Sequence, residues 1–532
     1  MNNFGSLFSM CLALLFACSF ASCDGGKTTA DAPMNVIYIM ADDHAFQAVS
    51  AYGEEVGKLA PTPNIDRIAA NGVRMDNVYC TNSICGPSRS SILTGQFSHV
   101  NGFYKNVDGG DFDGSLNTFP KVFQENGYET AVIGKWHLGT TPTGFDHSKV
   151  LINWGGQGTY FHPQFCINGQ DTVVEASRHS TKVIEDDCLE WLSEGRDETK
   201  PFMLLYQFKA PHRDWRPDSM YHDLFTDFDF PLPETFNDDY EGRRAASENM
   251  MEIGGHLNRR DMKQVPPAGL SRRDSMRWLA YGDKGQFWTP DDSLQGAALK
   301  EWKFQTYIKD YLRCVAGVDR AVGSVLDYLE ESGLAENTLV VYTSDQGFYL
   351  GEHGWFDKRW MYEESFRMPF LMQCPGSIEP GSVSDELAMN VDFAPTLLDF
   401  AGLPVPSSMQ GKSFRAPLVE GTSTTSRDAV YYHYYEYPIW HQVQPHYGVQ
   451  TDRYKLMHFY YSMDEWELYD LESDPLEMDN IYSTASDSLI LSLKATLKDL
   501  QKEFKDDAGM DEMKQMTDTV IARVYNEPRK SL

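Results

Sequence analysis

The chain has 532 residues, of which 42% are hydrophobic and 13% aromatic, and its formal net charge is −31. This length exceeds what one compact core usually accommodates, so we expect two or three structural units. The acidic balance argues against binding to nucleic acid, which requires a basic surface. It also provides no long-range attraction for an anionic substrate, so any bound anion must be held by a local group of cations.

The N-terminal segment predicts export. Residues 1–23 contain an apolar run that is too short to span a membrane and is followed by small residues. Phe20-Ala21-Ser22-Cys23 resembles a bacterial lipobox, in which Cys23 would be lipidated and become the mature N-terminus. Cys18 ends a competing site, and cleavage without a lipid is the alternative. We therefore expect an exported bacterial protein, periplasmic or membrane-anchored, which meets a membrane only through this lipid. Residues 24–33 would be a linker.

The remaining cysteines do not indicate a metal or disulfide framework. The chain has nine cysteines, and those beyond the export segment are scattered without a Cys-x-x-Cys pair. This pattern is typical neither of a zinc site nor of a small disulfide-rich domain.

Short apolar runs alternate with helical patterns over most of the chain. Residues 35–40, 130–133, 202–206 and 338–342 read as buried strands. Residues 64–71, 117–126 and 302–332 read as helices, the last ending before Gly333. Such alternation predicts an α/β fold with a mostly parallel sheet flanked by helices. Ligands of such folds bind beyond the carboxyl ends of the strands, and all four predicted strands are followed there by charged or imidazole residues.

The pattern of the sequence changes near residue 422. Short alternating strands precede an amphipathic helix over residues 487–503, so we expect a smaller C-terminal α+β subdomain with an antiparallel sheet over residues 422–532. Residues 34–421 would then form the larger α/β domain. Within it, residues 218–299 are polar and read as a long loop region with short helices.

Two predicted strands end in residues that suit a metal ion. Asp42 and Asp43 follow the first strand, and Asp345 and Gln346 follow the strand at residues 338–342. Carboxylate and amide oxygens are ligands for a hard cation such as Ca²⁺ or Mg²⁺. Each pair alone would more often be a helix cap or a solvated turn, but two pairs at buried strand ends favour the metal.

The stretch CGPSRSSILTG, from Cys85 to Gly95, predicts a helix that begins with a cysteine. Pro87 fits the first turn and Gly95 fits the end. A helix N-terminus favours negative charge, and Arg89 lies one turn along on the same face. Two interpretations stay open from these residues alone: a thiolate nucleophile, or a helix-capping loop with a buried thiol.

This stretch resembles the signature of type I sulfatases, Cys-x-Pro-Ser-Arg-x-x-x-Leu-Thr-Gly. GYETAVIGKWHLG at residues 127–139, the Ala210-Pro211-His212 segment, and SDQG followed by GEHG at residues 344–354 are similar to further family motifs. The resemblance runs from about residue 35 to about residue 482. It implies the alkaline-phosphatase-like α/β fold with a small C-terminal subdomain.

The resemblance also implies a cofactor and a modified residue. In the family, a maturation enzyme oxidises the cysteine to formylglycine, here at Cys85, and the metal is Ca²⁺ rather than Mg²⁺. The metal ligands would be Asp42, Asp43, Asp345, Gln346 and the modified Cys85. Many members have Asn where this chain has Gln346; the amide oxygen is kept, although the longer side chain shifts the geometry.

Roles for the remaining polar residues follow from the resemblance. The hydrated aldehyde would attack sulfur through one hydroxyl oxygen, and Arg89 and Lys135 would hold it and the sulfate oxygens. His137 would take the proton from the second hydroxyl so that sulfate leaves. His212 and Lys358 would bind sulfate oxygens, and His212 would protonate the leaving alcohol.

The sugar is indicated by two further segments. GWFDKR at residues 354–359 and PHYGV at residues 445–449 resemble the branch of sulfatases that act on N-acetylglucosamine 6-sulfate, as found in mucin or glycosaminoglycan chains. Asp357, Arg359 and His446 would bind sugar hydroxyls. The alternative is that Asp357 and Arg359 form an ion pair that orients Lys358.

Three other functions are compatible with the sequence. One is a formylglycine-dependent phosphonate or phosphate monoester hydrolase of the same fold. The second is a catalytically inactive glycan-binding lipoprotein, and the third is a thiolate enzyme using Cys85 directly.

Overall fold

The computed structural model describes residues 33–106, 112–281, 294–421 and 427–526. Residues 34–532 belong to one compact unit. The predicted export segment with Cys23 lies outside the described residues. Among the helices within those ranges, none combines the length and hydropathy needed to cross a bilayer. The six cysteines that the structure describes are all unpaired.

A ten-stranded sheet lies at the centre, with strand order β13-β2-β12-β9-β1-β8-β4-β5-β6-β7. Its central strands β9, β1, β8, β4 and β5 run parallel, while β12, β6 and β7 pair antiparallel with their neighbours. The mostly parallel sheet predicted from the sequence is therefore confirmed. The strands span β1 Asn35–Asp42, β2 Val73–Met75, β4 Glu129–Gly134, β5 His147–Leu151, β6 Gln164–Ile167, β7 Asp171–Val174, β8 Phe202–Pro211, β9 Thr338–Ser344, β12 Phe370–Gln373 and β13 Ser382–Ser384.

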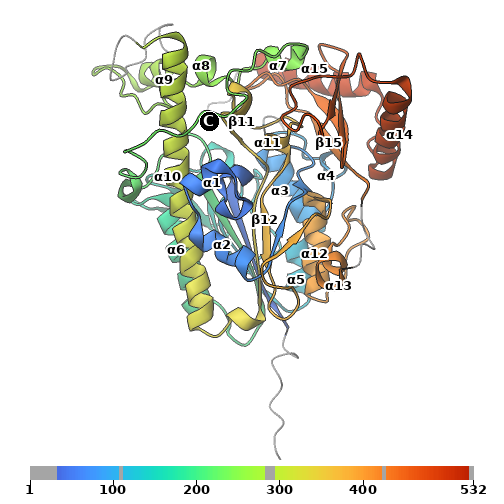
Figure 1. Cartoon of the computed structure of the whole chain (residues 1–532). Helices are drawn as coiled ribbons and strands as arrows, with labels where there is room; N and C mark the ends of the chain where they lie inside the picture. The colour runs from blue at the N-terminus through green and yellow to red at the C-terminus, as the bar shows by residue number, and fades with distance from the viewer. Residues whose placement is uncertain (1–32, 107–111, 282–293, 422–426, 527–532) are drawn as a thin grey trace, which may run out of the picture. The chain divides into compact units, whose positions relative to one another are not determined.

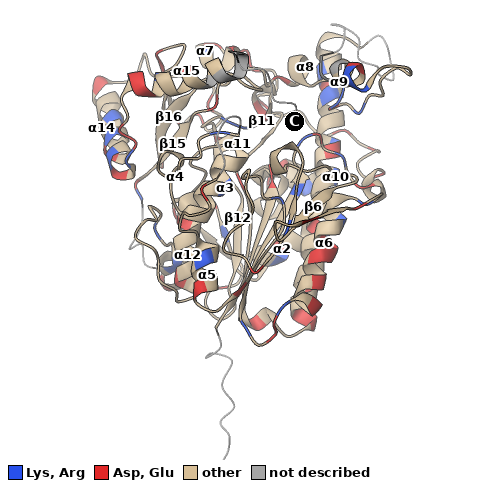
Figure 2. Cartoon of the chain, turned by 180° about the vertical axis from the view of Figure 1, so that it is seen from behind, with Lys and Arg blue, Asp and Glu red and all other residues tan. Residues whose placement is uncertain are grey.

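Helices cover both faces of this sheet because its strands are apolar on both sides. Along β1, Val36, Tyr38 and Met40 belong to one hydrophobic core, and Ile37 and Ile39 belong to the other. Helices α3, α5 and α12 pack on the first face, and α2, α6 and α10 on the second (Figures 1 and 2). These helices span α2 Pro63–Ala70, α3 Cys85–Thr94, α5 Phe119–Glu125, α6 Ser180–Glu190, α10 Gly296–Glu331 and α12 Phe393–Phe400.

Helix α10 is longer than the sequence predicted. It begins at Gly296 instead of residue 302 and has 36 residues. Its end is as expected: Gly333 has φ +73°, and the N–H of Leu334 donates to the carbonyl of Leu329 at 2.9 Å. This left-handed glycine and reversed hydrogen bond close the helix.

The C-terminal segment forms its own antiparallel sheet, as predicted. It consists of β15 Ala429–Tyr434, β16 His446–Thr451, β17 Tyr454–Phe459 and β18 Glu465–Asp470. Helix α14 Asp487–Phe504 packs on β15 and β16, and α15 Met510–Asn526 follows it. The sequence predicted only the first of these two helices. A division of the chain near residue 421 stays a prediction.

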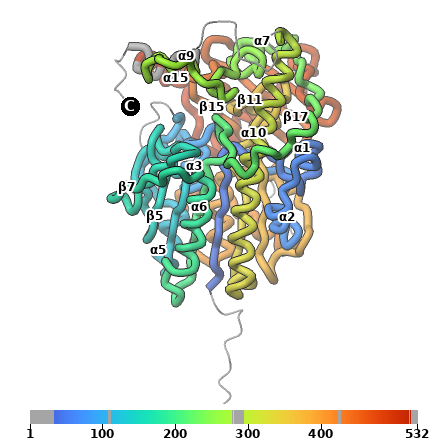
Figure 3. The backbone as a smooth tube through the Cα atoms, turned by 90° about the vertical axis from the view of Figure 1, so that its left-hand side faces the viewer, coloured from blue at the N-terminus to red at the C-terminus, as the bar shows by residue number. Residues whose placement is uncertain are grey.

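The region at residues 218–281 contains short helices, as expected, and meets the C-terminal segment. Figure 3 shows the two side by side beyond the carboxyl ends of the central strands. The N–H of Met250 donates to the carbonyl of His441 at 2.7 Å, and Arg243 donates to the carbonyl of Glu477 at 3.3 Å. The remaining short elements are α1 Glu55–Leu59, α4 Ser98–Asn101, α7 Arg244–Ser247, α8 Ile253–His256, α9 Arg272–Tyr281, α11 Glu363–Phe366, α13 Arg415–Glu420, β3 Val78–Tyr79, β10 Tyr349–Leu350, β11 Phe356–Asp357 and β14 Ala388–Met389.

Candidate active site

Two central strands, β1 and β9, end side by side at the candidate site. Ala41 pairs with Ser344 in the parallel register, so the residues that follow each strand leave the sheet together. The backbone N–H of Asp43 donates to Oδ1 of Asp345 at 3.1 Å. Asp43 has φ 65°, a left-handed conformation in which the chain turns sharply after the strand. The turn allows the consecutive carboxylates of Asp42 and Asp43 to face one point.

Four potential ligand atoms converge at this point. One oxygen each of Asp42 and Asp43, Sγ of Cys85 and a ring nitrogen of His212 all lie within 4.8 Å of one another. The sequence predicted the first three as metal ligands. His212 was expected to bind sulfate instead, and its Nε2 lies 3.7 Å from Oδ2 of Asp43.

Asp345 and Gln346 complete the group of oxygen donors. Nε2 of Gln346 donates to Oδ1 of Asp43 at 2.5 Å and to Oδ1 of Asp345 at 2.8 Å. Oε1 of Gln346 and Oδ1 of Asp42 are buried and have no hydrogen-bond partner among the described residues. An amide can present either its oxygen or its nitrogen, so rotation of the Gln346 side-chain amide would add one more oxygen to the group.

The charges of this group also fit a hard divalent cation. The pKa of Asp43 is raised to about 7: burial raises it most, Lys358 lowers it, and the neighbouring carboxylates of Asp42 and Asp345 add to the increase. Carboxylates crowded in a buried site resist ionisation unless a cation balances them. Three carboxylates, an amide and unpartnered oxygens are the donor set that Ca²⁺ or Mg²⁺ prefers.

Cys85 begins helix α3, as the sequence predicted. Gly95 follows the helix with φ 62° and closes it. Sγ of Cys85 lies 3.9 Å from Oδ1 of Asp43, and the residue is only 1% exposed. Burial and the neighbouring Asp42 carboxylate hold the pKa of the Cys85 thiol well above its usual range. A protonated thiol is a poor nucleophile, which argues against the thiolate enzyme.

Arg89 lies one turn further along α3, and its side chain contacts residues of three neighbouring segments. Its Nε donates to Oδ2 of Asp345 at 3.0 Å, and one terminal nitrogen donates to the carbonyl of Lys135 at 3.0 Å and to Oε1 of Gln207 at 2.9 Å. The other terminal nitrogen lies 3.6 Å from Oδ1 of Asp42 and has no hydrogen-bond partner among the described residues. Only this nitrogen is left for a ligand.

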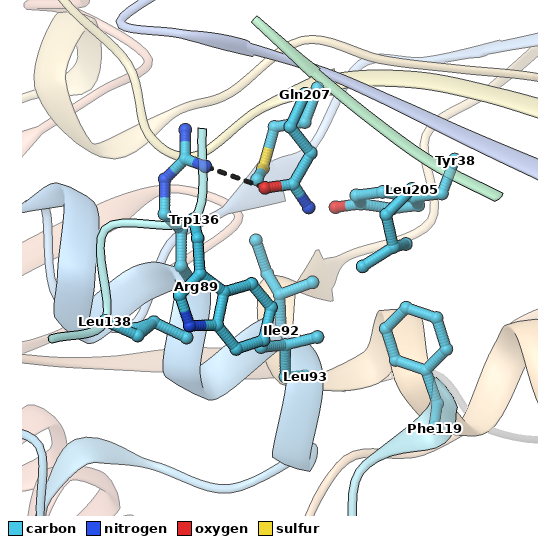
Figure 4. Close-up of a pocket in the computed structure, with 10 residues that line it drawn as sticks. Tyr38, Arg89, Ile92, Leu93, Phe119, Trp136, Leu138, Leu205 and Gln207 are labelled. Carbon is cyan, nitrogen blue, oxygen red and sulfur yellow. Dashed lines mark hydrogen bonds between the residues drawn. The ribbon is translucent and has the colours of Figure 1, made fainter. Parts of the chain in front are cut away.

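A small cavity lies behind Arg89 and Gln207 (Figure 4). Its volume is about 10 Å³, enough for one water molecule. The hydroxyl of Tyr38 and the ring N–H of Trp136 border it and have no partner among the described residues. No sequence pattern indicated Gln207 as a support for Arg89.

Cations surround the carboxylates. Nζ of Lys358 lies 2.6 and 2.7 Å from the two carboxylate oxygens of Asp43, and Lys135 pairs with Oδ2 of Asp42. His137 is buried, has φ 56°, and its Nδ1 has no partner among the described residues. Burial lowers the pKa of His137 well below its usual range, and Lys135 and Arg89 lower it further. The imidazole is therefore uncharged near neutral pH.

The pKa of His212 is lowered for a similar reason. Burial has the largest effect, followed by the positive charges of Lys358 and Lys135. All six residues predicted to carry out the reaction thus lie around this group of carboxylates: Cys85, Arg89, Lys135, His137, His212 and Lys358.

Asp357 and Arg359 flank Lys358 on a second side of the site. They form an ion pair with each other, and both have a left-handed backbone, with φ 80° and 101°. Nε2 of His441 lies 3.2 Å from the other carboxylate oxygen of Asp357. Arg359 and His441 hold the pKa of Asp357 well below its usual range, although burial alone would raise it.

The structure does not bring His446 to this group. Its Nδ1 contacts the carbonyl of Gln444 at 2.7 Å and its Nε2 accepts from the N–H of Met361 at 3.2 Å. The ring packs among Trp360, Phe459 and two tyrosines and is fully buried. With both nitrogens occupied, His446 has none left for a sugar, and His441 takes the position expected for it. The sequence WHQVQPH contains both histidines and no feature that distinguishes them.

Comparisons with known proteins agree with this geometry. The Sulfatase family profile matches residues 34–403, and a profile for the C-terminal part of N-sulphoglucosamine sulphohydrolase matches residues 351–503. An N-acetylglucosamine-6-O-sulfatase of Bacteroides thetaiotaomicron is 45% identical over 94% of this chain and 91% of its own length. An arylsulfatase of Clostridium perfringens is 26% identical over 85% of this chain and 90% of its own.

Two similar solved structures are compared with the chain. The structure of BT4656 in complex with its substrate D-glucosamine-2-N,6-O-disulfate has a TM-score of 0.83 and 44% identity, covering 90% of this chain and all of that one. A phosphonate monoester hydrolase from Silicibacter pomeroyi has a TM-score of 0.66 and 18% identity, covering 89% of this chain and 96% of its own, which shows a shared fold alone. The chain belongs to the sulfatase family and is a sulfuric ester hydrolase.

Proposed function

We propose that this sulfatase releases the 6-O-sulfate of N-acetylglucosamine in a host-type glycan. The observation that carries the proposal is the placement of Asp357, Arg359 and His441 next to Lys358, at the edge of the buried sulfate-binding group. Two of the comparisons support it: one relative is an N-acetylglucosamine-6-O-sulfatase, and one similar solved structure holds a glucosamine that carries a 6-O-sulfate.

The proposal includes formylglycine at Cys85 and Ca²⁺ held by Asp42, Asp43, Asp345 and Gln346. Together these two groups would supply an activated oxygen nucleophile. The unpartnered oxygens of Asp42 and Gln346 support the metal, and the high pKa of the Cys85 thiol favours a modified side chain over a thiolate.

The chain's own residues would hold and discharge the sulfate. Lys135, Lys358 and the free nitrogen of Arg89 would neutralise the sulfate oxygens in a site without bulk water, where such contacts are strong. His137 would accept a proton, as its neutral imidazole allows. His212 would protonate the departing sugar hydroxyl, and an anionic sulfate beside it would favour the imidazolium form that this step needs.

Asp357 would accept a hydrogen bond from one sugar hydroxyl, and Arg359 would donate one to a neighbouring hydroxyl. His441 would be the third residue that contacts the sugar. In the alternative interpretation their ion pair only orients Lys358. We also propose export and a lipid at Cys23; this part rests on residues 1–23 alone.

Sulfate release tests the function. The chain from residue 30 onward is co-expressed with a formylglycine-generating enzyme and supplied with Ca²⁺. The substrates are the 6-sulfates of N-acetylglucosamine, galactose and N-acetylgalactosamine. We expect release from the first, and none from Cys85→Ala. Release from another sugar would keep the sulfatase but discard the proposed specificity.

A matched phosphate ester separates the remaining alternatives. A faster rate on an aryl phosphate than on the matching aryl sulfate would identify a phosphate or phosphonate monoester hydrolase. Unmodified cysteine at position 85 in the native host would identify an inactive glycan-binding protein.

A further inference from the structure

Lys209 is a buried lysine without an oxygen partner. Among the described residues five lysines are buried, and four of them contact oxygen atoms: Lys135, Lys303, Lys358 and Lys455. The Lys209 residue is 5% exposed, and its ammonium group forms no hydrogen bond or ion pair with another described residue. An ammonium group has three donors, and where little water reaches them a negatively charged partner satisfies them best.

The surroundings of Lys209 tie it to the active site. Nζ lies 5.1 Å from the centre of the Tyr160 ring, and the Tyr160 hydroxyl donates to the carbonyl of His212 at 2.6 Å. The N–H of His212 donates in turn to the carbonyl of Lys209 at 3.0 Å. The lysine and the histidine therefore belong to one turn at the end of β8. The face of the Tyr160 ring attracts the ammonium group of Lys209, but it leaves the second and third N–H groups without an acceptor.

Neighbouring charges do not neutralise Lys209. Four charged groups act on the pKa of Lys209. Two of them, Lys135 and Asp42, pair with each other, and the other two are Asp214 and Arg260. Asp214 is already paired with Arg260 at 2.8 Å and with Arg216 at 3.2 Å, and both arginine side chains are 42% exposed. Among these charged groups around Lys209, the cations therefore outnumber the carboxylates. Burial, followed by the positive charge of Lys135, lowers the pKa of Lys209 to about 8, as expected where no anion compensates.

We propose that Lys209 is a further substrate-binding residue whose ammonium group holds a sulfate oxyanion of the glycan. The proposal rests on the proposed function and adds a cation to it on the side of Lys135 and His212. The oxyanion could belong to the ester that is hydrolysed or to a second sulfate on the same sugar.

The experiment compares Lys209→Met with wild type after formylglycine and calcium have been confirmed in both. Methionine keeps most of the apolar stem against Tyr160 and removes the charge. The substrates are N-acetylglucosamine 6-sulfate and D-glucosamine 2-N,6-O-disulfate. We expect kcat/KM to fall about 10- to 100-fold on at least one of them, the range for one charge-assisted hydrogen bond.

The two substrates identify the bound sulfate. Equal losses on both assign Lys209 to the ester that is hydrolysed. A loss confined to the disulfate assigns it to the second sulfate. Unchanged kcat/KM on both substrates overturns the proposal.

Lys149→Met is the matched control. Lys149 also lies over an aromatic ring, 5.5 Å from the centre of Phe165, but it is paired with Asp187 at 2.7 Å. We expect unchanged kinetics for this variant. Lys209→Arg should recover part of the loss, because it restores a donor cation, whereas a purely structural lysine would show a lower Tm without a change in KM.

A separate measurement keeps Lys209 testable if the proposed function fails. Should wild type release no sulfate from either sugar, inorganic sulfate is titrated into wild type and Lys209→Met by calorimetry. Weaker binding to the variant supports the oxyanion site, and equal binding contradicts it. If the methionine variant does not fold, Lys209→Gln takes its place in both measurements.

Discussion

The side of the site that faces sulfate and the side that faces the sugar are built on different parts of the fold. Asp42, Asp43 and Asp345 follow central strands that pair in register, and Cys85 begins a buried helix. Asp357 lies at the end of a two-residue strand, and His441 lies in the chain between β15 and β16. A sheet fixes the first group whatever the substrate, whereas loops can change the second group without disturbing the core.

The largest effect is expected on the sulfate side. Cys85→Ser should lower sulfate release at least about 10³-fold on every substrate, because serine has one hydroxyl and lacks the second one that would expel sulfate by reforming an aldehyde. Sulfate release from N-acetylglucosamine 6-sulfate and from 4-nitrophenyl sulfate measures this. Retention of activity by the serine variant would show that the reaction does not need formylglycine derived from a cysteine at this position.

On the sugar side the effect should depend on the substrate. Asp357→Ala and His441→Ala should each lower kcat/KM on N-acetylglucosamine 6-sulfate, the first by about 100-fold, because buried charged groups lose their partners. Both should act much less on 4-nitrophenyl sulfate, which has no sugar hydroxyls. Equal losses on the two substrates would mean that Asp357 serves Lys358 and not the sugar.

His446→Phe is the control for this comparison. The ring of His446 is surrounded by aromatic side chains, and both nitrogens bond to the backbone. We expect a lower Tm with KM unchanged. A raised KM for the sugar substrate alone would return His446 to the binding site.

A smaller effect is expected for Gln346, whose side-chain amide lies among the carboxylates of the site. Gln346→Ala should weaken Ca²⁺ binding at least about 10-fold, since one oxygen donor is lost from a hard-cation site. Gln346→Asn should bind more tightly than the alanine variant. Calorimetric titration with Ca²⁺ measures both, and identical affinities in all three proteins would exclude Gln346 as a ligand.

The smallest effect concerns the anchoring of the C-terminal sheet. Oδ2 of Asp506 accepts from the hydroxyl of Tyr431 and contacts Nδ1 of His433, both at 2.6 Å. Burial alone would raise the pKa of Asp506, but His433 holds it below its ordinary value of about 3.9. The carboxylate therefore stabilises the fold fully above about pH 4 and less as the pH falls below that value.

Asp506→Asn should accordingly lose about 1–2 kcal/mol at pH 7. The difference in Tm between wild type and variant should shrink as the pH is lowered from 5 to 3. A constant difference over that range would show that the charge of Asp506 does not contribute.

The sequence alone predicted the strand-end chemistry better than the sugar-facing residues. Asp42 and Asp345 come at or just after the ends of two apolar strands, so their meeting at one sheet edge follows from parallel pairing. Gly95 and Gly333 mark helix ends because their left-handed backbones favour glycine.

The remaining features depend on contacts between distant segments. His441 is placed by its hydrogen bond to Met250, nearly two hundred residues earlier, and no local pattern encodes that contact. Helix α15 was missed because its sequence is largely polar; Met513 and Thr517 are buried. Lys209 was visible beside Pro211 and His212, but only the structure shows that its ammonium has no oxygen partner among the described residues.

The burial of Cys85 has a consequence for the order of events in the life of the chain. With 1% of its surface exposed and a helix built on it, this side chain is out of reach of another protein's active site once folding is complete. Under the proposed function, a maturation enzyme would therefore have to reach Cys85 while the segment is still extended, before strands β1 and β9 close around it. Folding and maturation would compete in time, and protein that folds first would stay inactive.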